Sequence, residues 1–98
     1  MTRKGYIFVF DRSLRSDYTK LHKAIKDNRN ILNWWHYLTS GYILISTESA
    51  SELTNFMREN LPSDTYFIIM EINHNNYNGW LPQEAWDWIR ENIGTNIY

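Results

Sequence analysis

Asp11 is the residue whose position most suggests chemistry, because it directly follows the apolar run of residues 6–10. The carboxyl ends of central strands in open α/β sheets are where ligands and ions most often bind. One carboxylate per chain, doubled by a two-fold axis, could hold Mg²⁺ with water and a phosphate completing its coordination. Such a site could activate water for phosphodiester cleavage. The alternative is that Asp11 bonds the backbone of the following loop, as Asp commonly does in turns.

Two arginines and two aromatic stretches form a second candidate site. Arg12 and Arg15 follow Asp11 in one loop and could donate bidentate hydrogen bonds to a phosphate. An aromatic wall stacks nucleobase rings for about 1–3 kcal/mol per base. The rings that the fold could bring together are Trp34, Trp35, His36, Tyr37, Tyr77, Trp80, Trp86 and Trp88. The residues predicted to bind a ligand are Arg12, Arg15, Trp34, His36, Tyr77 and Trp80.

Packing is the alternative use of these rings, since each buried aromatic side chain removes about 150–250 Å² from water. Trp35 and Trp86 are the rings most expected in core or dimer contacts. His36 lies between two aromatic residues, where a hydrogen-bonded structural histidine is more common than a base. Neither His36 nor His74 has a visible Ser or Cys partner for a nucleophile pair. The sequence therefore indicates no catalytic residue, unless Asp11 serves a nuclease.

Composition excludes several classes of protein. The 98 residues contain no cysteine, which excludes a disulfide framework, a thiolate nucleophile and a thiolate metal site. Ten basic and eleven acidic residues give a net charge of −1, so no broad phosphate-binding surface is indicated. The apolar run at the start is too short for a signal peptide or a membrane span, and we expect a cytoplasmic protein without membrane contact. Five Trp and seven Tyr exceed what a core of this size needs, and such residues are enriched at interfaces.

Four strands are predicted from runs of apolar, aromatic and β-branched residues. Residues 6–11 form a central strand, and the segments 31–38 and 42–46 form a hairpin. The fourth strand covers residues 65–72. Within 31–38, alternation places Trp34, His36 and Leu38 on one face, and Trp35 with Tyr37 on the other.

Helices are predicted between these strands and after them. The first begins at a cap on Ser16 or Asp17 and ends near Asn28. Ser49 and Glu52 have the spacing of a capping box for the second, which Pro62 ends. The third follows an Asn-rich loop at 73–79 and covers 81–93, with Pro82 in its first turn.

This order predicts an α+β fold, a ferredoxin-like βαββαβ sandwich with a C-terminal helical extension. We expect one domain over residues 1–98, with 73–98 packing on the sheet or on a dimer partner. The first and fourth strands are apolar on both sides, so the sheet face without helices needs cover. A symmetric dimer covers it with one self-complementary surface.

Several segments resemble a family of small SinR-like proteins: the strand ending in Phe10-Asp11, WWHYL at 34–38, Ser-Ala-Ser-Glu at 49–52 and NYNGWLPQEAWDWI at 76–89. That family in turn resembles the small ferredoxin-like subunit of the CRISPR adaptation machinery and the VapD toxins. The resemblance implies a homodimer with a sheet-to-sheet interface and a divalent cation held by Asp11 between the chains. It also implies a role in phage–host conflict.

Two functions follow as expectations. The first is a non-catalytic homodimer that captures a nucleotide-like small molecule or a short single-stranded nucleic acid, without a cofactor. The second is a Mg²⁺-dependent endonuclease or endoribonuclease that uses Asp11. The slightly acidic charge and the lack of a second metal ligand favour the first. An interaction module with an exposed Trp surface is a third alternative.

Overall fold

The computed structural model describes residues 3–11, 18–36, 38 and 40–93. Strands and helices follow one another as β1 (Lys4–Phe10), α1 (Thr19–Asp27), β2 (Ile31–Trp35), β3 (Gly41–Ser46), α2 (Ala50–Asn60), β4 (Phe67–Glu71) and α3 (Gln83–Ile93). The α+β class expected from the sequence is confirmed.

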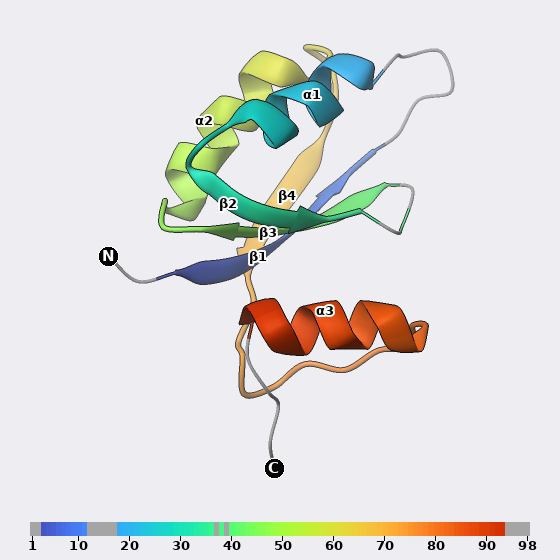
Figure 1. The fold of residues 1–98 in the computed structure, drawn as a ribbon. Helices are drawn as coiled ribbons and strands as arrows, with labels where there is room; N and C mark the ends of the chain where they lie inside the picture. The colour runs from blue at the N-terminus through green and yellow to red at the C-terminus, as the bar shows by residue number, and fades with distance from the viewer. Residues whose placement is uncertain (1–2, 12–17, 37, 39, 94–98) are drawn as a thin grey trace.

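The four strands form one antiparallel sheet in the order β2-β3-β1-β4. Helices α1 and α2 cover one face of this sheet, and α3 lies on the opposite side (Figure 1). We call the face opposite α1 and α2 the open face. In the described part of the chain, no helix is long and apolar enough to cross a membrane.

Alternation along β1 separates the core from the open face. Tyr6, Phe8 and Phe10 are at most 3% exposed, whereas Ile7 and Val9 are 38% and 42% exposed. Successive residues of a strand point to opposite faces, so the first three pack under the helices. The core is completed by apolar residues of the neighbouring elements: Leu21, Ile25, Ile31, Tyr42, Leu44, Leu53, Met57 and Leu61.

The second strand ends at Trp35 and is shorter than the predicted 31–38. A bulge interrupts the pairing with β3 between Ile31 and Asn33. After Trp35, the Nδ1 atom of His36 lies 2.8 Å from the Gly41 carbonyl oxygen, and Gly41 N–H donates to Leu38 O at 3.2 Å. These contacts lie within the turn and replace strand-to-strand bonds, so the pairing of β2 with β3 ends at Trp35.

Two helix caps were predicted, and the structure describes one of them. Ser49 and Glu52 form the expected capping box at the start of α2. The predicted caps of the first helix, Ser16 and Asp17, lie outside the described residues, and α1 has Tyr18 at its N-cap position.

Candidate functional site: a cavity between the sheet and the last helix

Helix α3 is held against the open face at one end and one side. Gly5 allows its close approach, because a Cβ atom at this position would lie 3.1 Å from Ile93 Cγ1. On the neighbouring edge strand, Asn33 Nδ2 donates to Asn92 Oδ1 at 2.8 Å. The inner side of α3 is buried through Ala85 and Ile89. These contacts fix the helix across the sheet without filling all the space beneath it.

A cavity of about 390 Å³ remains between α3, the segment before it and the open face. We call it the α3 cavity. It is lined by Ile7, Val9, Trp35, Leu38, Gly41, Tyr42, Ile43, Ile72, Tyr77, Asn78, Gly79, Trp80, Leu81, Trp86, Ile89 and Ile93. Among these described residues none is charged. The volume lies in the range typical of sites for small molecules, which are mostly apolar with a few polar groups.

Aromatic rings from three segments meet at this cavity. Tyr77 and Trp86 are stacked, with ring centroids 6.4 Å apart and planes 17° apart. Trp35 reaches the cavity from β2, and its ring lies 6.5 Å from that of Trp88 on α3. Trp80 lines the cavity and is nevertheless 99% exposed. A large aromatic side chain left fully in water beside an apolar cavity is the kind of feature that a ligand or partner covers.

The structure divides the predicted ligand-binding residues between the two sides of the sheet. Tyr77 and Trp80 line the α3 cavity, but Trp34 and His36 do not. Trp34 packs against the core under α1, with its ring 5.0 Å from that of His22. His36 stacks on Tyr42 at 4.0 Å with planes 9° apart. The structure therefore does not bring these four rings into one wall, because the sheet separates the two pairs, and ligand binding by Trp34 and His36 stays a prediction. Arg12 and Arg15 lie outside the described residues.

Trp35 and Trp86, the rings most expected in core or dimer contacts under the packing alternative, line the cavity. The signal for Trp35 was present: alternation places it opposite Trp34, on the same side as the exposed face of β1. For Trp86, helical spacing from Ala85 and Ile89 indicates the inner side of the last helix. What the sequence did not indicate is that α3 leaves a cavity there.

Asp11 stands apart from this cavity. It is exposed at the end of β1, and its main-chain N–H donates to Tyr66 O at 2.9 Å. Within the described ranges, no group of three acidic or histidine side chains could hold a metal ion. The Mg²⁺ site expected at Asp11 between two chains stays a prediction from the sequence.

Comparison with known proteins finds no matching family model, no matching curated protein and no matching solved structure. The resemblance to SinR-like proteins therefore stays a prediction.

Proposed function

We propose that this protein is a non-catalytic binding protein that holds a nucleobase-like ring in the α3 cavity. One observation carries the proposal: an uncharged cavity of about 390 Å³ is bordered by Tyr77, Trp86 and Trp35, with Trp80 exposed beside it. The ligand is the base of a nucleoside or nucleotide, or a base of a short single strand.

The uncharged, aromatic lining of the α3 cavity favours a planar ring over a phosphate group. Among the described lining residues there is no Lys or Arg to hold a phosphate. Stacking on aromatic side chains contributes about 1–3 kcal/mol per base and tolerates any base, since each has a π face. Tyr77 and Asn78 belong to the lining, and their side chains carry polar atoms of the kind that can bond the edge of a base. The sugar and phosphate then extend into solvent.

Trp80→Ala tests the proposal at low structural cost, because the side chain is 99% exposed. Wild-type protein is titrated with adenosine, guanosine, cytidine, uridine and a short oligothymidine, and binding is followed by calorimetry and quenching of Trp fluorescence. We expect loss of one stacking ring to raise the dissociation constant about 5- to 150-fold, the equivalent of about 1–3 kcal/mol.

Trp34→Phe is the matched control, because Trp34 lies on the helix side of the sheet and does not line the cavity. It should bind as the wild type does. The proposal fails if no member of the panel binds, or if Trp80→Ala and wild type bind equally.

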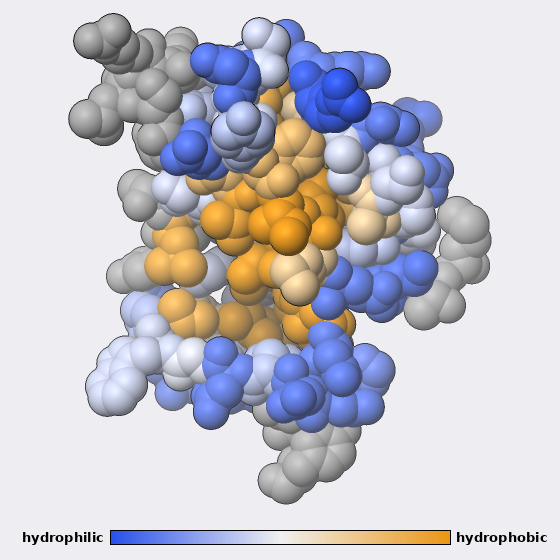
Figure 2. Space-filling model, turned by 180° about the vertical axis from the view of Figure 1, so that it is seen from behind, coloured by the Kyte–Doolittle hydropathy of each residue, from blue (hydrophilic) through white to orange (hydrophobic). Residues whose placement is uncertain are grey.

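The open face also supports a homodimer. Ile7 pairs with Met70 and Val9 with Ile68 across β1 and β4, and all four side chains are 38–56% exposed. Figure 2 shows apolar side chains gathered in the middle of the side that is turned away in Figure 1. Contiguous exposed apolar surface of this kind marks interaction sites, and a two-fold axis lets one patch cover its own copy.

A ferredoxin-like classification with a C-terminal extension belongs to the same proposal. It is supported by the succession of β1, α1, β2, β3, α2 and β4 and by a sheet in which β1 and β3 are the inner strands. In that topology two βαβ units interlock, which leaves one sheet face open for α3 and a partner.

A further inference from the structure

The free edge of β4 is a second binding feature, distinct from the α3 cavity. β4 lies at the end of the sheet and pairs with β1 alone. In the described part of the chain, no other strand pairs with its outer edge. An edge strand presents a row of main-chain donors and acceptors that can accept another strand.

Hydrogen bonds to β1 identify which residues of β4 point outward. Asp11 N–H donates to Tyr66 O at 2.9 Å, and Ile72 N–H donates to Gly5 O at 2.8 Å. In an antiparallel pair the bonded residues alternate, so Ile68 and Met70, between these two, also face β1. Phe67 and Ile69 therefore direct their N–H and C=O groups away from the sheet.

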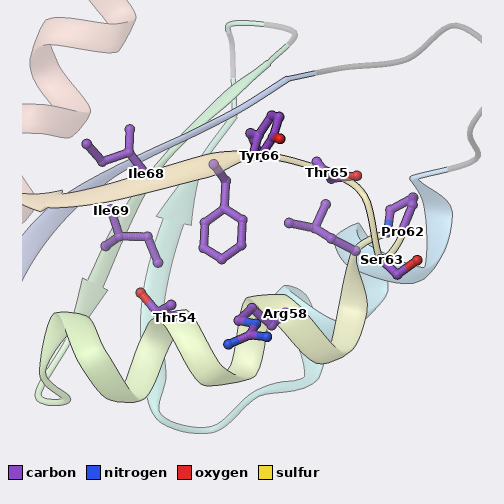
Figure 3. A pocket seen from close by; sticks show the side chains of 10 residues that line it. Thr54, Arg58, Pro62, Ser63, Thr65, Tyr66, Ile68 and Ile69 are labelled. Carbon is purple, nitrogen blue, oxygen red and sulfur yellow. The ribbon is translucent and has the colours of Figure 1, made fainter.

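A groove of about 520 Å³ lies beside this edge, between β4 and α2. We call it the β4 groove. Figure 3 shows its side chains: Thr54 and Arg58 come from α2, and Tyr66, Ile68 and Ile69 come from β4 and the residue before it. Its floor is apolar through Leu61 and Phe67. An incoming strand could therefore pair with the edge and place alternate side chains in the groove.

Arg58 is the single charged residue among the described residues that line the groove. It is exposed, and the ion pairs of the described chain, Lys23–Asp27 and Arg90–Asp87, do not include it. Thr54 precedes it by one helical turn on the same face of α2. A guanidinium in this position suits a carboxylate, which it can hold with two parallel hydrogen bonds.

We propose that the β4 groove binds an extended acidic peptide, which adds to the sheet beside β4 and places a carboxylate on Arg58. An outward edge with alternating N–H and C=O groups requires a partner with the same alternation. A polypeptide strand supplies it, whereas a nucleic-acid backbone offers mainly acceptors.

A second copy of the chain fits the groove less well than a separate peptide. The helix-side residues of its own β4, Phe67 and Ile69, already pack against its own core. They are not available to fill the β4 groove of a partner. The side chains of a free peptide are not packed in a core of their own and can enter the groove.

Amide hydrogen exchange of the free protein is the first test. The N–H groups of Ile68 and Met70 should exchange slowly, and those of Phe67 and Ile69 rapidly. Slow exchange at Phe67 and Ile69 at every protein concentration would overturn the proposal, because the edge would be covered within the chain. Protection that appears only at high concentration would overturn it in favour of a second copy.

Selection from a phage-displayed library of short random peptides is the second test, followed by synthesis of the enriched peptides. We expect enriched sequences to alternate apolar and polar residues and to carry Asp, Glu or a free C-terminal carboxylate. Their binding should protect the amides of Phe67 and Ile69. Arg58→Gln should weaken binding at least about tenfold, while Arg29→Gln, an exposed arginine outside the groove, should leave it unchanged. The proposal would be refuted if no peptide is enriched, or if the enriched peptides bind Arg58→Gln as tightly as the wild type.

Discussion

Tyr6 shows how one polar atom is accommodated in the core. Its side chain is 1% exposed, and its hydroxyl donates to the Glu48 carbonyl oxygen at 2.7 Å. Burial raises the pKa of the Tyr6 hydroxyl, and the negative charges of Glu71 and Glu52 raise that pKa further. The neutral form is therefore the one that the folded state stabilises.

Stability should fall in alkaline solution because of Tyr6. A raised pKa means that its contribution is complete below about pH 10, the ordinary tyrosine value, and is lost as the pH rises through the folded-state pKa. We expect Tyr6→Phe to cost about 1 kcal/mol at pH 7, through the lost hydrogen bond, and to lessen the alkaline fall. Urea unfolding at pH 7 and above pH 10 measures both. Tyr66→Phe, at an 83% exposed tyrosine, is the control, and an unchanged alkaline fall in Tyr6→Phe would contradict the argument.

For single residues, the sequence predicted on which face of a strand a side chain lies better than it predicted which side chains lie next to one another. Strand alternation placed Trp34 and Trp35 on opposite sides, as observed, because the backbone period decides it. Trp34 and Trp80 lie on different sides of the sheet, which the sequence could not predict because the 73–79 loop could cross either face. Only the packed structure, with Gly5 admitting α3 on the open face, decides which face it takes.

Among the elements, α2 has the best-defined start. Ser49 Oγ accepts a hydrogen bond from Glu52 N–H at 3.1 Å, and Ser49 N–H donates to Glu52 Oε1 at 3.0 Å. These reciprocal bonds satisfy two main-chain groups that the first turn otherwise leaves unpaired. The hydrogen bonds from Ser49 lower the pKa of the Glu52 carboxyl below its ordinary range, with a smaller contribution from Lys4.

Ser49→Ala should lower the free energy of unfolding by about 1 kcal/mol, measured by urea unfolding at pH 7. The matched control is Ser51→Ala, at an exposed serine inside the same first turn. Because the folded-state pKa of Glu52 is lowered, its contribution is present above about pH 4.3 and is lost as the pH falls through the folded-state pKa. Glu52→Gln should therefore flatten the acid part of the stability profile. Equal stability of Ser49→Ala and Ser51→Ala would show that the cap contributes nothing.

The sequence predicted which segments form helices and which form strands, but it did not predict where β2 ends. Caps and apolar spacing indicated α2 and α3 within a few residues, because these signals are local. The predicted end of β2 lies three residues beyond the observed end at Trp35, after which His36 Nδ1 lies 2.8 Å from the Gly41 carbonyl oxygen. That contact depends on how the hairpin closes, which no short-range pattern encodes.

On the scale of the whole molecule, the open face keeps exposed apolar side chains. Helix α3 lies over part of it, and the α3 cavity opens beneath the helix. Ile68 and Met70 of β4 stay 54% and 56% exposed. Apolar burial contributes about 25 cal/mol for each Å² removed from water, so covering these residues with a second copy stabilises both chains. Ile7 and Val9 belong both to this patch and to the lining of the α3 cavity, whereas Met70 lines neither the cavity nor the groove, so Met70 is the position that tests the dimer separately.

Met70→Lys should separate the proposed dimer, because a charge in an apolar two-fold contact appears twice and lacks a partner. Met70 lines neither the α3 cavity nor the β4 groove, so nucleoside and peptide binding to each chain should persist. Sedimentation velocity over a range of concentrations should show a dimer for wild type and a monomer for Met70→Lys. Leu32→Lys, at a 49% exposed leucine on the opposite edge strand, should remain dimeric. A wild type that stays monomeric at high concentration, or a dimer that survives Met70→Lys, would show that the open face is not the interface.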